Sequence, residues 1–346
     1  MDDVLFEKRG RGGIIVLNRP KALNALTLEM VHAMRAQLEA WRGDRDVELV
    51  IIRGAGERAF CAGGDIRALY ESGKASSPYA IDFYAHEYRL NALIKRYRKP
   101  YVAMINGIAM GGGVGVSVHG RYRVAGEGCV FAMPETGIGL FPDVGGTYFL
   151  PRMPGQTGMY IALSGARMNV VDCFATGIAT HMVPAAEHDA LVRSLCEETG
   201  ALEPMLSRAA VRPSEQSRVM GLMPAINRHF AANSVEDILA SLASDNSLFA
   251  SETLKALRSK SPTSMKVTYR QIREGAKRGF EDCMRLEFRL TNRFMSGRDF
   301  YEGVRALIID KDQAPKWSPS SLEGVSEAIV DDYFAPLTSG DLDLSA

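Results

Sequence analysis

Residues 101–115 read YVAMINGIAMGGGVG, an apolar run that ends at Asn-Gly and is followed by a triple glycine. The apolar run predicts a buried strand, because it is too short for a core helix and lies between Pro100 and Asn106-Gly107. The small residues from Val114 to His119 could form a helix. A strand that passes through glycines into a helix N-terminus leaves backbone N–H groups unpaired. Such groups can hold an anion, or a carbonyl oxygen that becomes one.

The same arrangement occurs earlier in the chain. Residues 49–52 read LVII, a second buried strand, and residues 59–66 read AFCAGGDI, which predicts a strand end, a glycine turn and the start of a helix. Between the two glycine stretches, residues 80–98 look helical and stop before Pro100. Strands that alternate with helices through short turns predict parallel strands and an α/β architecture.

Both ends of the chain carry recognisable local signals. Val4 to Leu17 predicts a hairpin, or a turn between short strands, around Gly12-Gly13, and Thr27 can cap a following helix. After about residue 155 the strand signal fades. Helical patterns follow at 185–199, 235–242 and 265–293, the last interrupted near residues 275–279. We therefore expect residues 1–200 to form the core with the active site and residues 201–346 to form a helical C-terminal region.

Composition excludes several classes of function. The 346 residues carry 41 basic and 41 acidic side chains, so the zero net charge gives no sign of a nucleic-acid or anionic-membrane partner. Five widely spaced cysteines without a CxxC pair indicate reduced thiols, and the six histidines have no metal-ligand spacing. No stretch resembles a signal peptide, a transit peptide or a membrane span. We expect a soluble cytoplasmic protein without a metal.

The two glycine stretches have two interpretations. Gly64 and Gly112 could each direct a backbone N–H into a shared cleft, or could serve only to make tight turns between strand and helix. Their duplication favours the oxyanion interpretation. The glycines at 111–115 match no dinucleotide or P-loop motif. Ser117 resembles a hydrolase nucleophile, but His119 stands where the closing glycine of that motif belongs.

Two carboxylates follow in loops rich in glycine and proline. Glu135 and Asp143 each come directly after a proline, and their sequence neighbours form an apolar wall without an opposite charge. A carboxylate in such a wall would have a raised pKa and could act as base, acid or nucleophile. Loop acids are more often solvated or serve as caps. An oxyanion site together with paired carboxylates is, however, typical of acyl or enolate chemistry.

These motifs together resemble the crotonase (enoyl-CoA hydratase/isomerase) superfamily. The similarity is strongest to the branch that hydrolyses 3-hydroxyisobutyryl-CoA, and it extends over most of the chain. It rests on residues 61–67 (CAGGDIR), 110–120 (MGGGVGVSVHG), 133–146 (MPETGIGLFPDVGG), 261–264 (SPTS) and 309–317 (IDKDQAPKW). The resemblance implies a core that is a spiral of ββα turns, followed by a helical C-terminal region.

The resemblance also implies roles for individual residues. Gly64 and Gly112 would hold the thioester oxygen, and the segments Lys21–Leu23 and Ala62–Ile66, with Ala62 and Asp65 among the contacts, would lie along the CoA moiety. Two more residues would contact the substrate: Glu135, which matches one of the two hydratase glutamates, and Glu87, which would hold the substrate's hydroxyl group. Gly115 stands where the second hydratase glutamate would be, which disfavours hydration. Asp143 matches an aspartate of the hydrolase branch.

The implied reaction is hydrolysis of 3-hydroxyisobutyryl-CoA to 3-hydroxyisobutyrate and CoA in valine catabolism, with no cofactor beyond the CoA of the substrate. Glu135 would either attack the thioester to form an anhydride or activate water, while Asp143 would position the water. The alternatives are an enoyl-CoA hydratase or isomerase that uses only Glu135, and a non-catalytic acyl-CoA binding protein. The same contacts would accept 3-hydroxypropionyl-CoA. A homo-oligomer is a further expectation, of undefined size.

Overall fold

The computed structural model describes residues 2–344 and divides by contacts into two units, each made of three chain segments. Unit 1 comprises the described residues of Met1–Asp65, Arg89–Ala132 and Arg167–Gly221; unit 2 comprises those of Ile66–Tyr88, Met133–Ala166 and Leu222–Ala346. The chain therefore passes between the units several times. The boundary expected between residues 200 and 201 stays a prediction.

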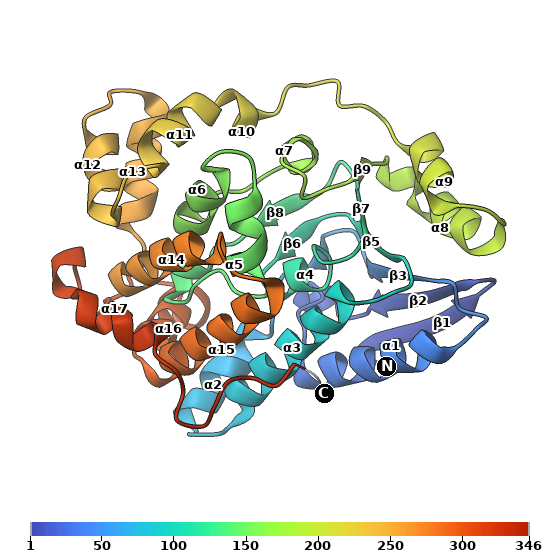
Figure 1. Ribbon diagram of the computed structural model, residues 1–346, viewed down its shortest axis with the longest axis horizontal. Helices are drawn as coiled ribbons and strands as arrows, with labels where there is room; N and C mark the ends of the chain where they lie inside the picture. Colours follow the sequence, from blue (N-terminus) through green and yellow to red (C-terminus); the bar gives the residue numbers. More distant parts are fainter. Residues whose placement is uncertain (1, 345–346) are drawn as a thin grey trace. The chain divides into compact units, whose positions relative to one another are not determined.

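Unit 1 contains the two sheets. The larger sheet has the strand order β1-β2-β3-β5-β7-β9 and the smaller one β4-β6-β8, and every pairing except β1 with β2 is parallel (Figure 1). The strands are β1 Val4–Arg9, β2 Gly12–Leu17, β3 Leu49–Gly54, β4 Ala59–Cys61, β5 Tyr101–Ile105, β6 Ile108–Met110, β7 Tyr122–Ala125, β8 Val130–Ala132 and β9 His181–Met182. Three successive strand pairs each give their first strand to the larger sheet and their second to the smaller one. This confirms the expected spiral of ββα turns.

The hairpin at the N-terminus is confirmed, but its turn is not where we expected it. The turn is at Gly10 and Arg11, and Gly12 and Gly13 are the first residues of β2, paired with Arg9 and Lys8. Space explains the glycines in the strand: a Cβ on Gly12 would lie 2.4 Å from the sulfur of Cys196, and one on Gly13 would lie 2.8 Å from the Trp41 ring. These glycines allow close packing rather than a turn.

The larger sheet buries one face under helices of its own unit. Ile14, Ile51, Val102 and Tyr122 pair successively across β2, β3, β5 and β7, and all four are buried. Helices α8 (His188–Glu197) and α9 (Leu202–Ala209) add leucines such as Leu195 to the same core. On α1 (Leu28–Gly43), Met30, Met34 and Leu38 recur at helical spacing and are buried. The Thr27 cap expected for this helix is confirmed, since its side chain accepts from the Met30 N–H.

Two expected helices have different bounds in the structure. The helix expected at 80–98 is α3 (Tyr79–Lys95). The helix expected at 114–119 is wrong: α4 is a single turn, Gly112–Gly115, that begins at the glycines themselves. Ser117 Oγ donates to the carbonyl of Gly113 at 2.8 Å and approaches that of Val114 at 3.1 Å. A serine that bonds back to the preceding turn competes with helix continuation.

Unit 2 contains no named strand within its described residues. Its helices include α2 (Ile66–Lys74), α5 (Gly146–Phe149), α6 (Thr157–Ser164), α11 (Met223–Phe230), α12 (Val235–Ala243), α13 (Leu248–Arg258), α14 (Pro262–Gly275), α15 (Phe280–Ser296), α16 (Asp299–Val304) and α17 (Glu327–Phe334). The interruption expected near residues 275–279 is confirmed as the link between α14 and α15. Of the remaining helices, α7 (Val170–Ala175) and α10 (Arg218–Gly221) belong to unit 1. Within residues 2–344, no helix combines the length and the apolar character needed to cross a bilayer.

Candidate active site

The two predicted glycine turns lie next to each other in unit 1. Strands β4 and β6, which precede them, are parallel neighbours, with Cys61 paired to Ala109. A Cβ on Gly63 would lie 3.7 Å from the backbone nitrogen of Gly112, so the two loops are in contact. Among the described residues, the N–H groups of Gly64 and Gly112 have no hydrogen-bond acceptor. Two neighbouring unpaired donors are what an oxyanion site needs.

Glycine is required at two positions in these turns. Gly63 has φ +117°, a conformation that side chains strongly disfavour. A Cβ on Gly113 would lie 2.1 Å from the carbonyl oxygen of Cys61, because α4 packs directly against the end of β4. The alternative interpretation, that glycine is needed here to make a tight turn, therefore applies to Gly63 and Gly113. It leaves Gly64 and Gly112 as the residues that carry the unpaired donors.

The two segments predicted to lie along CoA are hydrogen-bonded to each other. Ala62 N–H donates to the Leu23 carbonyl at 3.0 Å, and Asp65 N–H donates to the Leu26 carbonyl at 2.9 Å. The Asp65 carboxylate is 3.0 Å from the guanidinium of Arg19. Leu23 has φ +52°, so the loop turns back sharply beside the glycine turn. The residues predicted for CoA contact that belong to unit 1, Lys21–Leu23 and 62–65, thus lie next to each other.

The predicted carboxylates all belong to unit 2. Glu87 is on α3, Glu135 begins a short 3-10 turn (Glu135–Ile138), and Asp143 precedes α5. They are buried, with exposed fractions of 2%, 5% and 4%. Glu87 Oε1 and Glu135 Oε2 are buried without a hydrogen-bond partner. Buried acceptors without partners are costly, so these two atoms are candidates for contact with a substrate.

Asp143 is held by side chains that sequence reasoning missed. Tyr88 Oη donates to Asp143 Oδ2 at 2.8 Å and lies 2.7 Å from Thr291 Oγ1 of α15. The next residue, Val144, has φ +50°, a strained backbone for a β-branched side chain. Glu287 of α15 accepts from the N–H groups of Gly145 and Thr147 at 2.8 and 2.9 Å. These bonds hold the strained loop in place.

A second helix holds the same loop. Gln271 Nε2 of α14 donates to the Pro142 carbonyl at 2.6 Å and to Thr147 Oγ1 at 2.7 Å. In the sequence, the only sign that Glu287 and Gln271 are buried is their position among apolar residues in a stretch with helical periodicity. Only the tertiary contacts give the two residues their role, which is to position the backbone beside Asp143.

Burial dominates the titration of these acids. It raises the pKa of Glu135 and of Glu87 well above the ordinary value, and the negative charge of Asp143 raises both further. Burial raises the pKa of Asp143 to about 7, against the hydrogen bond from Tyr88, which lowers it. Burial likewise raises the pKa of Glu287 to about 8. The expectation of raised pKa values for Glu135 and Asp143 is confirmed.

One part of that expectation is wrong. The sequence neighbours of Glu135 include no opposite charge, but Lys260, in the link between α13 and α14, comes close to the same 3-10 turn. A Cβ on Gly137 would lie 3.2 Å from Lys260 Nζ. The positive charge lowers the pKa of Glu135, although less than burial raises it. Burial in turn lowers the pKa of Lys260. A residue 125 positions away (260 − 135) could not be paired with Glu135 from the sequence.

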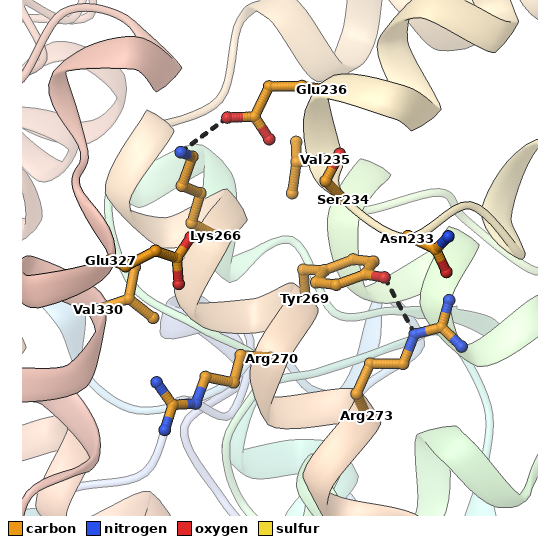
Figure 2. Close-up of a pocket in the computed structure, with 10 residues that line it drawn as sticks. All are labelled: Asn233, Ser234, Val235, Glu236, Lys266, Tyr269, Arg270, Arg273, Glu327 and Val330. Atoms are coloured by element: carbon orange, nitrogen blue, oxygen red, sulfur yellow. Dashed lines mark hydrogen bonds and ion pairs between the residues drawn. The ribbon is translucent and has the colours of Figure 1, made fainter.

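A separate pocket in unit 2 contains none of the predicted residues. It has a volume of about 230 Å³ and lies among α12, α14 and α17 (Figure 2). Two of its cations have acidic partners: Lys266 Nζ is 2.7 Å from Glu236, and Arg270 bonds to Glu274 and Asp331. The third, Arg273, donates to the Tyr269 hydroxyl and to the carbonyls of Ala231 and Ala232. Within residues 2–344 no group of three or more His, Cys, Asp or Glu side chains is arranged to hold a metal ion.

Comparison with known proteins places this arrangement in a family. A family model described as enoyl-CoA hydratase/isomerase matches residues 12–334. The chain is 51% identical to 3-hydroxyisobutyryl-CoA hydrolase, mitochondrial, of Danio rerio, an alignment that covers 99% of this chain and 92% of the relative. It is 48% identical to the protein of the same name from Homo sapiens, with 99% and 90% covered.

Solved structures give the same fold. A carnitinyl-CoA dehydratase from Mycobacterium thermoresistibile is 40% identical, with a TM-score of 0.95 and coverage of 100% of this chain and 99% of the other. An enoyl-CoA hydratase from Rhodobacter sphaeroides 2.4.1 is 41% identical, with a TM-score of 0.91 and coverage of 99% and 100%. The fold expected from the sequence is confirmed.

The comparisons correct one expectation. We expected a cytoplasmic protein, whereas the curated hydrolases named above are described as mitochondrial. The cytoplasmic assignment is therefore wrong. It rested in part on reduced thiols, which do not distinguish one reducing compartment from another.

Proposed function

Since the chain belongs to the enoyl-CoA hydratase/isomerase family, we propose that it hydrolyses the thioester of 3-hydroxyisobutyryl-CoA to 3-hydroxyisobutyrate and CoA, a step of valine breakdown. The observation that carries the proposal is the similarity, over nearly the whole chain, to hydrolases of that name. Gly115, where a hydratase of the family would have its second glutamate, supports hydrolysis over hydration.

The thioester oxygen accepts hydrogen bonds from the N–H groups of Gly64 and Gly112. These donors are unpaired and adjacent in unit 1, so they need no rearrangement to receive the oxygen. When the carbonyl carbon becomes tetrahedral, the oxygen gains negative charge and both hydrogen bonds strengthen. Removal of one such donor in comparable sites costs about 3–4 kcal/mol of transition-state stabilisation.

Glu135 acts on the carbonyl carbon in its charged form, by one of two routes. In the first, its carboxylate attacks the carbon, the C–S bond breaks, and water then hydrolyses the resulting mixed anhydride. In the second, it takes a proton from water, and the hydroxide attacks. In either route the thiolate of CoA takes up a proton, which Asp143, with a pKa of about 7, can supply near neutral pH. Trapping with hydroxylamine in a single turnover distinguishes the two routes, because only the mixed anhydride of the first route can leave a hydroxamate on Glu135.

Glu87 selects the acyl group. Its Oε1 atom is buried without a partner and accepts a hydrogen bond from the 3-hydroxyl of the substrate. An acyl group without that hydroxyl leaves the buried oxygen unpaired, which costs about 1–3 kcal/mol. CoA itself lies along Lys21–Leu23 and Ala62–Ile66, where Ala62 and Asp65 contribute backbone contacts. The reaction uses these side chains, water and the thioester, and no separate cofactor.

The test is release of CoA thiol from 3-hydroxyisobutyryl-CoA by the wild type and by Glu135→Gln and Asp143→Asn. We expect rapid release by the wild type, and a fall of roughly 10²–10⁴-fold in kcat for each variant. 3-Hydroxypropionyl-CoA and butyryl-CoA, run in parallel, report the acyl preference. Loss of the enone absorbance of crotonyl-CoA without thiol release would instead identify a hydratase. Binding without turnover, unaffected by Glu135→Gln, would identify a non-catalytic acyl-CoA binding protein.

A further inference from the structure

One face of α14 carries a row of uncharged polar side chains in the interior of unit 2. Ser264, Thr268 and Gln271 follow one another at i, i+4 and i, i+3 positions, so they lie on the same side of the helix. All three are fully buried, with exposed fractions of 0%. The opposite face of α14 lines the pocket of Figure 2 with charged and aromatic side chains: Lys266, Tyr269, Arg270 and Arg273.

Each side chain of the row has an oxygen atom without a hydrogen-bond partner among the described residues: Ser264 Oγ, Thr268 Oγ1 and Gln271 Oε1. A helical hydroxyl can bond back to the preceding turn, as Ser296 Oγ of α15 does with the Asn292 carbonyl at 2.8 Å. Neither Ser264 nor Thr268 makes that bond. Because buried polar atoms are costly when unpaired, the three oxygens indicate a partner other than residues 2–344.

The row lies between the two segments of unit 2 that carry the acids. At the start of α14, the Ser261 N–H donates at 3.2 Å to the carbonyl of Thr136, which follows Glu135. Farther along the helix, Gln271 Nε2 donates at 2.6 Å to the loop that carries Asp143. A partner bound along the row would therefore connect the surroundings of one acid with those of the other.

The spacing of the row fits water molecules. Neighbours at i, i+3 and i, i+4 have Cβ atoms about 5–6 Å apart, roughly twice the length of an O–H···O hydrogen bond. One water between Ser264 and Thr268, and one between Thr268 and Gln271, would give all three oxygens a partner. Internal waters in proteins typically make about three hydrogen bonds to buried polar groups, which the row and a neighbouring water can supply.

We propose that this face of α14 binds a row of internal water molecules, and that these waters hold the Asp143 loop through Gln271. A water on Gln271 Oε1 fixes the orientation of the amide, so that Nε2 stays directed at the Pro142 carbonyl. That bond restrains a loop in which Val144 is strained, with φ +50°. Thr268 is thus a positioning residue that acts through Gln271. This role rests on the proposed function of Asp143, whereas the water site does not.

The first test is a high-resolution crystal structure of the wild type, compared with that of Thr268→Val. Valine has nearly the same shape as threonine but cannot hydrogen-bond through its side chain. We expect water within hydrogen-bond distance of the three oxygens in the wild type, and loss of the water beside residue 268 in the variant. A wild-type structure with no water beside these oxygens would overturn the proposal.

The second test measures thiol release and urea unfolding. Thr268→Val should lower kcat about tenfold or more and leave KM unchanged, because a small displacement of a catalytic group is costly while the substrate contacts remain. Its urea midpoint should fall, because Gln271 and the waters lose a partner. Thr268→Ser keeps the hydroxyl and should retain the kcat of the wild type. The control, Thr176→Val, removes a buried hydroxyl of unit 1 that donates to the Asp172 carbonyl at 2.7 Å, and should lower the midpoint without changing kcat.

Two kinetic results would also overturn the proposal. One is an unchanged kcat or a raised urea midpoint in Thr268→Val, since replacement of an unpaired buried hydroxyl by a methyl group is stabilising. The other is an equal loss of kcat in Thr268→Val and Thr268→Ser, which would identify an effect of packing. If the wild type releases no thiol, the proposed function fails, and the crystal structures still decide the water site.

Discussion

The environment of Asp143 depends on a single side-chain hydrogen bond. Tyr88 Oη donates to Asp143 Oδ2 at 2.8 Å, and this bond lowers the pKa of Asp143 against the larger effect of burial. Thr291 lies 2.7 Å from the same hydroxyl and fixes its orientation. Tyr88 is thus a positioning residue that acts through Asp143.

We expect Tyr88→Phe to raise the pKa of Asp143 further above about 7, because the charged carboxylate loses its donor. The limb of the pH–kcat profile that reports Asp143 should move to higher pH by roughly one unit. The control is Tyr269→Phe, which removes a hydroxyl bonded to the Ala232 carbonyl and away from the acids. A Tyr88→Phe profile that superimposes on that of the wild type would refute this role.

Ser261 connects the start of α14 to another element of unit 2. Its Oγ accepts from the Ser264 N–H at 3.1 Å and donates to Asp299 Oδ2 at 2.6 Å. The other oxygen of Asp299 accepts from the Ser318 N–H at 2.8 Å. One serine therefore caps a helix and also pairs a buried acid, which gives a structural reason for the SPTS motif.

We expect Ser261→Ala to lower the free energy of unfolding by about 2–4 kcal/mol, the sum of a lost cap and of an acid that loses its donor. The matched control is Ser247→Ala at the start of α13. Ser247 Oγ also caps its helix by accepting from the Ala250 N–H, but it has no buried acid as partner. We therefore expect Ser247→Ala to lower the free energy of unfolding by only about 1 kcal/mol. Urea unfolding of both variants measures the difference. Equal losses would show that the Asp299 bond adds nothing.

Across the molecule, the buried acids couple stability to pH. Glu287 is fully buried, and burial raises its pKa from 4.5 to about 8. A group with a raised pKa in the folded state binds its proton more tightly there than in the unfolded chain. The stability from this proton is fully present below pH 4.5 and is lost as pH rises through about 8.

We therefore expect the free energy of unfolding to fall between pH 5 and pH 8.5, with Glu287 contributing up to about 5 kcal/mol of the fall. Glu287→Gln lacks the titrating group, so its free energy of unfolding should fall less over the same pH interval, even if its stability at pH 5 is lower. The measurement is urea unfolding of both proteins at several pH values. Parallel curves for wild type and variant would contradict the assignment.

Local features of the fold could be predicted because near neighbours in the chain determine them. The glycine turns after β4 and β6, the Thr27 cap and the break between α14 and α15 each depend on residues within a few positions. Our predictions of the bounds of α4 and of the turn of the first hairpin were wrong, because contacts that periodicity does not report decide both features. The helix ends where Ser117 bonds back to Gly113, and the turn position depends on the packing of Gly12 and Gly13 against Cys196 and Trp41.

The sequence by itself determined the ββα spiral, the two glycine donors and the identity of Glu135, Asp143 and Glu87 as candidates, because these follow from local pattern and resemblance. Only the tertiary structure decided what surrounds them. Tyr88 and Asp143 are 55 residues apart, and Gly145 and Glu287 are 142 apart. A charge or hydrogen bond acts through space, and the folded chain alone sets which distant residues lie within its range.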